Sequence, residues 1–285
     1  METRAAPPGP CSRPFRHLVV PVDRSADAER AAMVGALLAR STGAQLHLLH
    51  VEEEPTERAA APQGSVRDLA RRYGAVAAVR ALGGTARPPA EIIVEYADDL
   101  DDAALCMAAG RARPGAPALG SVSAEVLRRS ARPVLMVGAS GRRSPAGLRR
   151  VVASVDGTPT GLGVVAPAAR WARQLDVPLA LVELVEPDGG PFGAASAAPT
   201  VAEREARRLT DLGLSTGWEA LSSPDPAAAL LGYLGGADSL MAMMAAEHPA
   251  TGALAPGSLA AAVVHGAAGP VMLFNPPEPS SPAHR

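Results

Sequence analysis

The sequence contains no lysine, and every one of its 27 basic residues is an arginine. Two kinds of chemistry need a lysine side chain. The Walker phosphate loop uses its ammonium group to hold phosphates, and Schiff-base catalysis uses its amine as a nucleophile. Both are therefore excluded for this chain.

Cysteines and long apolar runs are also scarce. Cys11 and Cys106 show no paired spacing, so we expect reduced thiols and no disulfide. There is no run of 18 apolar residues and no apolar signal segment, which predicts a cytoplasmic protein without membrane association. Because 27 basic and 29 acidic residues leave a net charge of −2, nucleic acid is not an expected partner.

Groups that carry catalysis or bind metals form no pattern either. The six histidines make no helical pair and no set with carboxylates at metal-ligand spacing, so no metal site is expected. No Gly-x-Ser-x-Gly pattern follows an apolar run, which leaves a Ser-His-Asp triad without support. Cys106 lies in an apolar segment and is interpreted as a small buried side chain. We therefore expect no catalytic residues and a protein that is not an enzyme.

An internal repeat at an offset of 137 residues is what the sequence does contain. Residues 107–109 and 244–246 both read Met-Ala-Ala, and residues 120–121 and 257–258 both read Gly-Ser. Taken without a gap, this offset places Met244 opposite Met107. Apolar residues make up 47% of the chain, which is enough for a core in each of two domains.

The repeat divides the chain into two domains joined by a short polar linker. A stretch rich in Gly, Ser, Arg and Pro follows residue 138 and is typical of such a linker. The predicted parts are a disordered tail over 1–15, a first domain over 16–138, a linker over 139–149, a second domain over 150–275 and a disordered tail over 276–285.

Short apolar runs alternate with helical stretches in each copy, which is typical of βαβ units on a parallel sheet. The predicted fold class is α/β, with two tandem doubly wound domains, each a five-stranded parallel sheet in the order 3-2-1-4-5 with four helices. The expected strands cover residues 17–22, 45–51, 76–82, 103–107 and 133–137 in the first copy, and 151–155, 179–185, 215–221, 240–244 and 270–274 in the second.

Ligands of such sheets bind beyond the carboxyl ends of the strands, where the winding direction reverses. In the first copy, Asp23 and Ser25 follow the first strand, and Gly110 is separated by nine residues from Gly120 and Ser121 after the fourth. Glycines let backbone amides approach phosphate oxygens, and a helix N-terminus offers free N–H groups to an anion. These two loops are the candidate ligand site.

The Gly110, Gly120, Ser121 spacing, the strand that ends at Asp23 and the Arg-Pro-Val run at 132–134 resemble the universal stress protein family, twice along the chain. The resemblance implies an adenine nucleotide such as ATP, with Mg²⁺ entering only with the nucleotide, and a regulatory role in stress without dedicated turnover. The implied binding residues are Pro21, Val22, Asp23, Ser25, Val51, Met107, Ala108, Gly110, Gly120, Ser121 and Val122, with Asp156, Gly257 and Ser258 as weaker counterparts in the second copy.

The sequence departs from the family pattern at two places. Met107 stands where the first glycine of the family motif is expected, so a bulky side chain is expected close to the nucleotide. In the second copy the repeat puts Glu247 at the Gly110 position, where a carboxylate would repel phosphates, and Pro256 supplies no N–H. We therefore expect the second copy to bind ATP far more weakly than the first, or not at all.

Several alternatives stay open from the sequence alone. Asp23 fits a turn or helix-capping role as well as a ligand contact, Asp156 is interpreted as structural, and each Gly-Ser pair fits an ordinary helix N-cap. The alternative function is a nucleotide-free interaction scaffold in which both loops have decayed. An unpaired sheet edge invites pairing, so the last strands, 133–137 and 270–274, are expected to join the copies as an intramolecular pseudo-dimer. A homodimer and an unidentified protein partner are further expectations.

Overall fold

A computed structural model describes residues 15–23, 25–52, 66–82, 87–110, 119–140, 147–185, 199–245 and 258–275. Apart from Phe15, both predicted tails lie outside these ranges, as do residues 141–146 of the predicted linker. The domain boundaries therefore stay a prediction. Across the described residues, no helix has the length and apolar character needed to cross a membrane.

The first half alternates strands and helices in the predicted order. Every predicted strand is found, with each end within one residue of its expected position. The elements are β1 (His17–Pro21), α1 (Ala26–Thr42), β2 (Gln45–Glu52), α2 (Val66–Tyr73), β3 (Val76–Ala81), α3 (Pro89–Asp98), β4 (Ala103–Ala108), α4 (Ser121–Arg129) and β5 (Val134–Val137).

The second half repeats this plan, and its strands also lie within one residue of their predicted ends. The elements are β6 (Arg150–Val155), α5 (Pro159–Leu162), α6 (Val165–Leu175), β7 (Leu179–Val185), α7 (Val201–Asp211), β8 (Thr216–Ser222), α8 (Pro226–Leu234), β9 (Ser239–Met244), α9 (Leu259–Gly266) and β10 (Val271–Phe274).

One element of the second half differs from the prediction of four helices. The helix that corresponds to α1 is interrupted, so that α5 and α6 take its place. Pro167 explains the interruption: it has no N–H to donate to the carbonyl of Gly163, and its ring would clash with that carbonyl in a continuous helix. Gly163 instead donates its own N–H to Thr160 O in a tighter turn.

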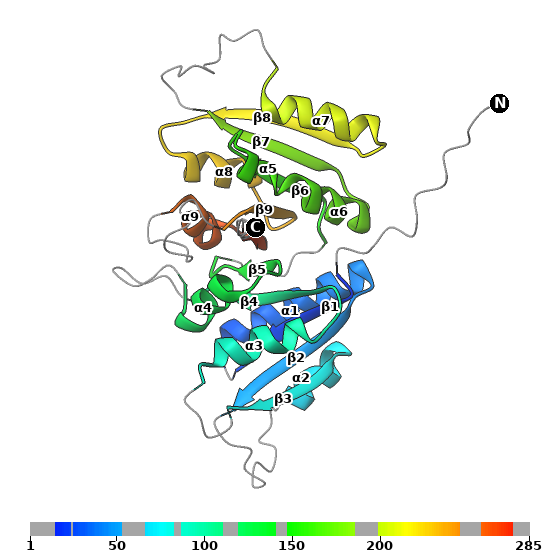
Figure 1. Cartoon of the computed structure of the whole chain (residues 1–285), viewed down its shortest axis with the longest axis vertical. Coiled ribbons are helices and arrows are strands. Elements are labelled where there is room, and N and C mark those ends of the chain that lie inside the picture. The colour runs from blue at the N-terminus through cyan, green and yellow to red at the C-terminus, as the bar shows by residue number, and fades with distance from the viewer. Residues whose placement is uncertain are drawn as a thin grey trace, which may run out of the picture.

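All ten strands form one sheet in the order β3-β2-β1-β4-β5-β10-β9-β6-β7-β8. Each half is parallel and has the predicted order 3-2-1-4-5, so that fold class is confirmed. The halves meet where β5 and β10 pair antiparallel, with Leu135 opposite Met272. The expected pseudo-dimer through the last strands is therefore confirmed, and it makes the two half-sheets continuous along the long axis of the molecule (Figure 1).

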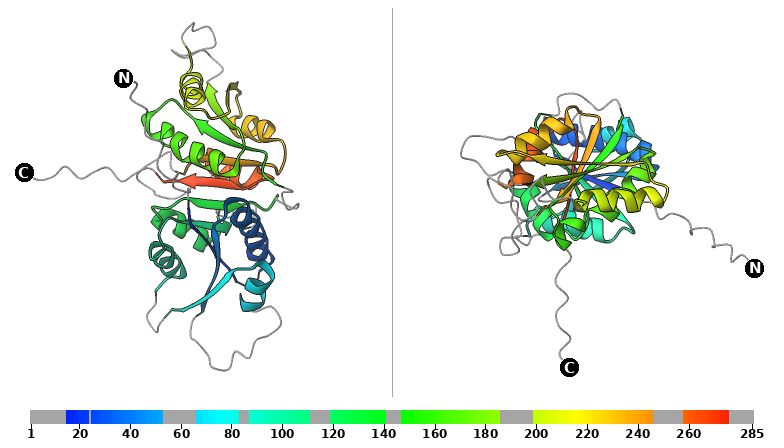
Figure 2. Two further views of the ribbon diagram at one scale, coloured as in Figure 1. Left: turned by 90° about the vertical axis from the view of Figure 1, so that its right-hand side faces the viewer. Right: turned by 90° about the horizontal axis from the view of Figure 1, so that it is seen from above.

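Helices cover both faces of this sheet (Figure 2). Under α1, α2, α6 and α7 lies one apolar layer, which includes Leu18 and Ala153. Under α3, α4, α8 and α9 lies the other, which includes Leu105 and Met243. Because both faces of the sheet are buried, the central strands are apolar without alternation, as in the AALCMA run of β4.

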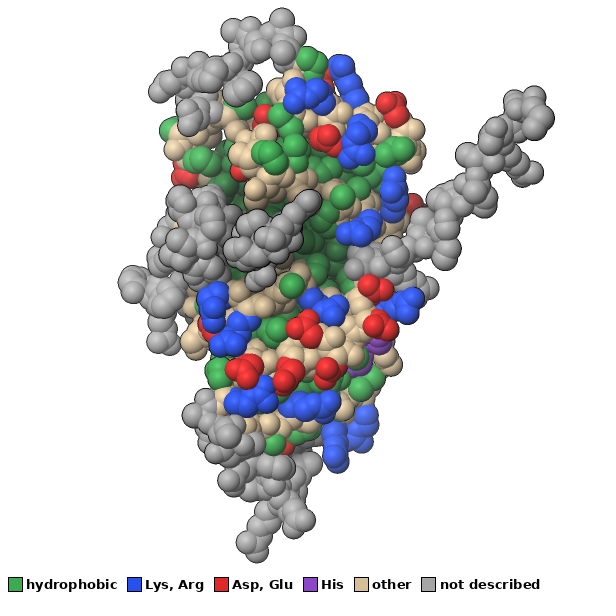
Figure 3. Space-filling model, viewed as in Figure 1, with side chains coloured by type: hydrophobic (Ala, Val, Ile, Leu, Met, Phe, Trp, Pro, Cys, Tyr) green, Lys and Arg blue, Asp and Glu red, His purple; other side chains and the backbone are tan. Residues whose placement is uncertain are grey.

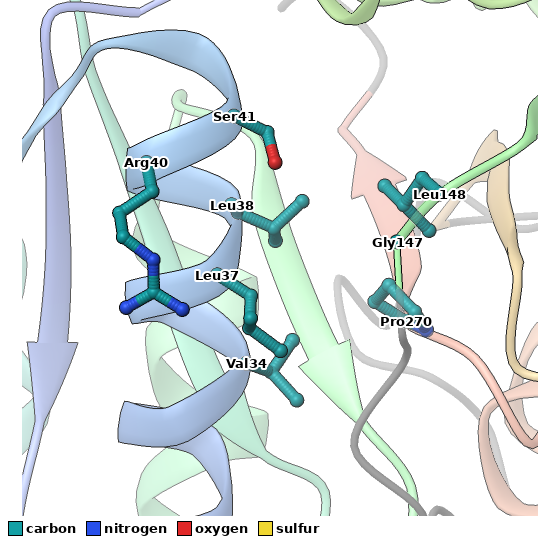
Figure 4. A pocket seen from close by; sticks show the side chains of 8 residues that line it. All are labelled: Val34, Leu37, Leu38, Arg40, Ser41, Gly147, Leu148 and Pro270. Carbon is teal, nitrogen blue, oxygen red and sulfur yellow. The ribbon is translucent and has the colours of Figure 1, made fainter.

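Contacts beside the β5–β10 pair tie the halves together. The rings of Phe15 and Trp171 are 4.5 Å apart, and both side chains are almost fully buried. Gln174 of α6 donates its side-chain N–H to Thr42 O at the end of α1, at 2.7 Å. The seam also holds a cavity of about 220 Å³ between α1 and the chain entering β6. Leu38 is among the apolar side chains of α1 that line it, facing Leu148 and Pro270 across the gap (Figure 4).

Candidate functional site

The loops after β1 and β4 meet at one edge of the sheet, because these strands are parallel neighbours. Val19 of β1 lies opposite Leu105 of β4, and the strands end at Pro21 and Ala108. The winding direction reverses between β1 and β4, which is where open parallel sheets bind ligands. The two loops identified from the sequence therefore share one edge of the sheet.

Asp23 is exposed directly after β1. Its Oδ1 accepts a hydrogen bond from the N–H of Ser25 at 2.8 Å, and the Ser25 hydroxyl accepts the N–H of Ala28 at 3.1 Å at the start of α1. Ser25 is thus the N-cap of α1, and Asp23 forms the turn before it. Among the described residues, Asp23 Oδ2 has no hydrogen-bond partner, so one carboxylate oxygen stays open to a ligand.

His50 is a polar side chain at this edge that the sequence analysis did not single out. Its Nδ1 lies 2.8 Å from Val22 O, and because a carbonyl only accepts, Nδ1 carries the proton of this bond. Its position could have indicated this place, because His50 follows Leu49 of β2, and Leu49 pairs with Pro21 at the end of β1. The next residue, Val51, is half-buried and packs against the layer under α3 and α4.

Met107 and Ala108 point to opposite faces of β4. The Met107 side chain is 5% exposed and packs in the layer under α3 and α4, so the core accommodates its bulk. Ala108 is half-buried and packs against the other layer. The side chain at the end of β4 on the α1 side is therefore only a methyl group, so no bulky side chain occupies this part of the sheet edge.

Both ends of the loop between β4 and α4 are fixed by their backbone. Gly110 has φ +83°, a conformation that favours glycine, and an added Cβ would lie 3.2 Å from the N atom of Gly120. Gly120 in turn donates its N–H to Ala109 O at 3.1 Å. The nine-residue spacing thus begins and ends at two glycines in contact. Residues 111–118, between them, are outside the described residues.

The first turn of α4 is open to an anion. Gly120 is the N-cap and offers no side chain, and the first intrahelical bond runs from Ala124 N to Gly120 O. Within the described residues, the N–H groups of Ser121, Val122 and Ser123 have no acceptor. The Ser121 hydroxyl, also without a partner there, is exposed. Three free N–H groups and the positive end of a helix dipole are the elements of a phosphate site.

The corresponding edge of the second half is closed by its own side chains. Asp156 Oδ1 accepts both the N–H and the hydroxyl of Thr158, at 2.9 and 2.7 Å. Its carboxylate lies so close to Gly161 that an added Cβ there would overlap it, at 1.9 Å. Asp156 therefore forms the turn before α5, as Asp23 does before α1, and differs in also accepting the hydroxyl of the residue two positions on.

A second carboxylate stands at this edge, on β7. When Asp23 is aligned with Asp156, Glu183 has the place that His50 has in the first half, because Val155 pairs with Glu183 and Pro21 with Leu49. Its Oε2 accepts the N–H of Ala202 at 2.9 Å, in the first turn of α7. With Asp156, this places two carboxylates at the edge where the first half has Asp23 and an imidazole.

The strand registers correct the predicted repeat. Leu105 N bonds Pro133 O in the first half, and Met241 N bonds Pro270 O in the second. The last strands therefore keep the offset of 137, whereas β4 and β9 are related by 136. The gap-free offset is wrong here because a shift of one residue would turn every side chain of β9 to the other face.

This correction changes which residues correspond. Met243 is the counterpart of Met107, and Met244 is the counterpart of Ala108. The offset returns to 137 by Ser258, the counterpart of Ser121, so the one-residue difference is made up within residues 246–257. The expectation that Glu247 takes the Gly110 position stays a prediction. Positions 246 to 257, including Glu247, Pro249, Pro256 and Gly257, lie outside the described residues.

The helix after β9 also differs from α4. Ser258 is the N-cap of α9, and its hydroxyl accepts the N–H of Ala261 at 3.2 Å. Met244 is half-buried and packs against the layer under α6, where Ala108 leaves only a methyl group in the first half. The second half thus caps its own helix and fills its own edge.

No metal-binding cluster of His, Cys, Asp or Glu occurs among the residues that the structure describes. Cys106 is fully buried, as predicted, and burial raises the pKa of its thiol to about 12, so it stays protonated. On the face drawn in Figure 3, acidic and basic side chains are interleaved over both halves. That face offers no patch of one charge to a polyanion.

Comparison with known proteins identifies a family for the first half. Residues 14–138 match the model of the universal stress protein family. A search of curated proteins finds no match. A single-domain structure, a universal stress protein from Archaeoglobus fulgidus in complex with dAMP, is 22% identical, covers 43% of this chain and 96% of that chain, and has a TM-score of 0.32.

Two solved structures are similar to both halves together. A universal stress protein from Archaeoglobus fulgidus is 16% identical, covers 91% of this chain and 98% of that chain, and has a TM-score of 0.67. A functionally unknown protein from Pseudomonas aeruginosa is 19% identical, covers 92% and 93%, and has a TM-score of 0.60. At these identities the likeness shows the fold, including its tandem arrangement.

Proposed function

Because residues 14–138 belong to the universal stress protein family, we propose that the first half of this chain binds ATP or a related adenine nucleotide. The protein would act as a stress-response regulator through this binding, without dedicated turnover. Mg²⁺ would enter only with the nucleotide. The nucleoside would lie near Asp23 and Val51, and the phosphates near Gly110, Gly120 and Ser121.

One observation carries this proposal: within the described residues, no side chain caps the N-terminus of α4. A helix of this kind normally satisfies its first N–H groups with a side chain of the N-cap residue, and Gly120 has none. The free N–H groups of Ser121, Val122 and Ser123 would donate to phosphate oxygens. Such bonds are charge-assisted and about twice as strong as neutral ones.

The second half is proposed not to bind nucleotide, or to bind it far more weakly. Ser258 already satisfies one N–H of α9. The carboxylate of Glu183 stands at this edge where the first half has the imidazole of His50, and its negative charge repels phosphates. Met244 occupies the place of Ala108. These observations on the described residues support the asymmetry independently of Glu247.

Substitution of Gly120 by Asp gives a sharp test. An added Cβ at Gly120 meets no atom of the described residues within 4 Å, so the variant fits this part of the fold. Asp is a strong N-cap and would stabilise α4, but its carboxylate would stand where the phosphate binds. We expect Gly120→Asp to unfold at the same or higher temperature and to bind ATP at least about tenfold more weakly.

The matched control is Ser258→Ala, which removes the N-cap of α9. It should lower stability by about 1 kcal/mol and leave ATP affinity unchanged. Calorimetric titration of ATP into the full chain, with and without Mg²⁺, measures all three proteins. Equal affinity of Gly120→Asp and wild type would contradict the proposed site. No measurable affinity of the wild type would favour the nucleotide-free scaffold.

A further inference from the structure

Each half reaches across the β5–β10 pair to the last helix of the other half. The residue after β10, Asn275, lies at the carboxyl end of α4. In the corresponding place after β5, Gly138 lies at the carboxyl end of α9. The two contacts are related by the same repeat as the strands, but they differ in chemistry.

Asn275 closes the carboxyl end of α4. Its Nδ2 donates to Leu127 O at 2.6 Å and to Ser130 O at 2.7 Å. The last carbonyls of a helix have no intrahelical partner, and among the described residues Leu127 O has no other donor. One side chain of the second half thus satisfies two carbonyls of the helix whose other end is open to an anion.

The mirror contact cannot work in the same way. An added Cβ at Gly138 would lie 2.3 Å from Val264 O, so no side chain fits there. Two residues further on, the hydroxyl of Ser140 donates to His265 O at 3.0 Å. The specific two-carbonyl cap is therefore placed on α4 and not on α9.

We propose that Asn275 is a positioning residue for the anion-binding end of α4, so that nucleotide binding by the first half is coupled to the docking of the second half. This inference rests on the proposed function. α4 has only nine residues, so a constraint at its carboxyl end fixes the direction of its first turn. The second half then serves as the regulatory partner of the site rather than as a second site.

The coupling has a defined thermodynamic form. Without Asn275, α4 populates orientations in which its first N–H groups do not point at the phosphates. The apparent affinity for ATP is then the intrinsic affinity multiplied by the fraction of chains in which α4 keeps the binding orientation. Reciprocity requires that nucleotide bound at α4 also tighten the contact of Asn275. The contact between Asn275 and the carboxyl end of α4 should therefore become more stable when nucleotide binds at the other end of α4.

The test compares ATP affinity of the full chain in wild type, Asn275→Ala and Ser140→Ala. Asn275→Ala should bind ATP about three- to tenfold more weakly, as expected for the loss of one or two hydrogen bonds. Ser140→Ala loses one contact across the same joint, but on α9, and should bind within about twofold of wild type. Equal affinity of Asn275→Ala and wild type would overturn the inference and leave the proposed function standing.

A second measurement needs no variant. Hydrogen exchange of the wild type should slow in residues 270–275 when ATP binds, and this protection should be absent in Asn275→Ala. If Asn275→Ala does not fold, Asn275→Ser, which can donate to one carbonyl only, takes its place. Unchanged exchange of residues 270–275 in the ATP-bound wild type would overturn the coupling. A wild type that binds no ATP would overturn both this inference and the proposed function.

Discussion

Met107 and Met243 occupy equivalent points of the two half-sheets: each is buried in the layer under the later helices of its half, at 5% and 4% exposure. Sequence identity alone pairs Met107 with Met244, whose side chain lies on the other face. The distinction matters for function, because Met244 then corresponds to Ala108 at the candidate site. The Met244 side chain fills the space at the sheet edge of the second half that the methyl group of Ala108 leaves open in the first half.

Alanine substitutions test this register. Met107→Ala and Met243→Ala each remove a fully buried side chain and should cost about 2–5 kcal/mol of unfolding free energy. Met244→Ala removes a half-buried one and should cost clearly less. Urea denaturation of the three variants measures the difference. A larger loss for Met244→Ala than for Met243→Ala would contradict the register.

Gly110→Ala should weaken both the fold and ATP binding. The new side chain has to adopt a positive φ and crowds Gly120 N at 3.2 Å, which moves the start of α4. Gly213→Ala is the matched control, because Gly213 has φ +78° and an added Cβ meets nothing within 4 Å. Each variant should lose about 1 kcal/mol from the backbone. Only Gly110→Ala should lose ATP affinity, and equal affinities would show that the loop is not part of the site.

Gly138→Ala should disrupt the joint between the halves. Its Cβ would overlap Val264 O, which is backbone and cannot rotate away, so we expect a loss of about 3 kcal/mol in unfolding free energy. Gly232→Ala in α8 is the control: its Cβ meets open space, and the helix should gain about 0.5–1 kcal/mol. Thermal unfolding monitored by circular dichroism separates the two. A Gly138→Ala chain as stable as wild type would refute the close packing of the joint.

Stability should fall with acid through His47. Its Nδ1 lies 2.9 Å from the Tyr96 hydroxyl and its Nε2 3.0 Å from Nδ1 of His17, while the Arg80 guanidinium lies over the Tyr96 ring. Burial, and then the nearby His17, lower the pKa of His47 from 6.5 to about 4.

The sign follows from linkage. Between pH 6.5 and about pH 4, His47 is protonated in the unfolded chain but stays neutral in the folded chain. The contribution of neutral His47 to folding stability is therefore fully present above about pH 6.5 and is lost as the pH falls toward 4. The loss is about 1.4 kcal/mol for each unit of pKa difference. Urea denaturation at pH 7 and pH 4.5 should show a smaller decline for His47→Gln than for wild type. An equal decline would assign the acid sensitivity to other groups.

The fold could be predicted from the sequence because both faces of each half-sheet are buried. Continuous apolar runs such as that of β4 mark the strands to within one residue, and the edge of the last strands predicts the β5–β10 pair. The register of β9 could not be predicted in the same way. The Met-Ala-Ala match at 244–246 is locally strong, but the pairing of β9 with β10 shows that it is shifted by one residue.

The candidate site was predicted in part. Gly110, Gly120 and Ser121 are recognisable from spacing, and the structure brings the two glycines into contact. His50 and Glu183 were missed, because their importance depends on which strands end side by side rather than on a local motif. Asn275 was missed for a similar reason: its partners lie about 145 residues earlier in the chain and in the other half.

The central claim is that one helix N-terminus per chain, that of α4, holds the nucleotide. Hydrogen exchange of the full chain with and without saturating ATP tests it directly, because residues 119–123 and 258–262 report on α4 and α9 in one experiment. The account predicts slower exchange in 119–123 and no change in 258–262. Protection of 258–262 without protection of 119–123 would contradict it.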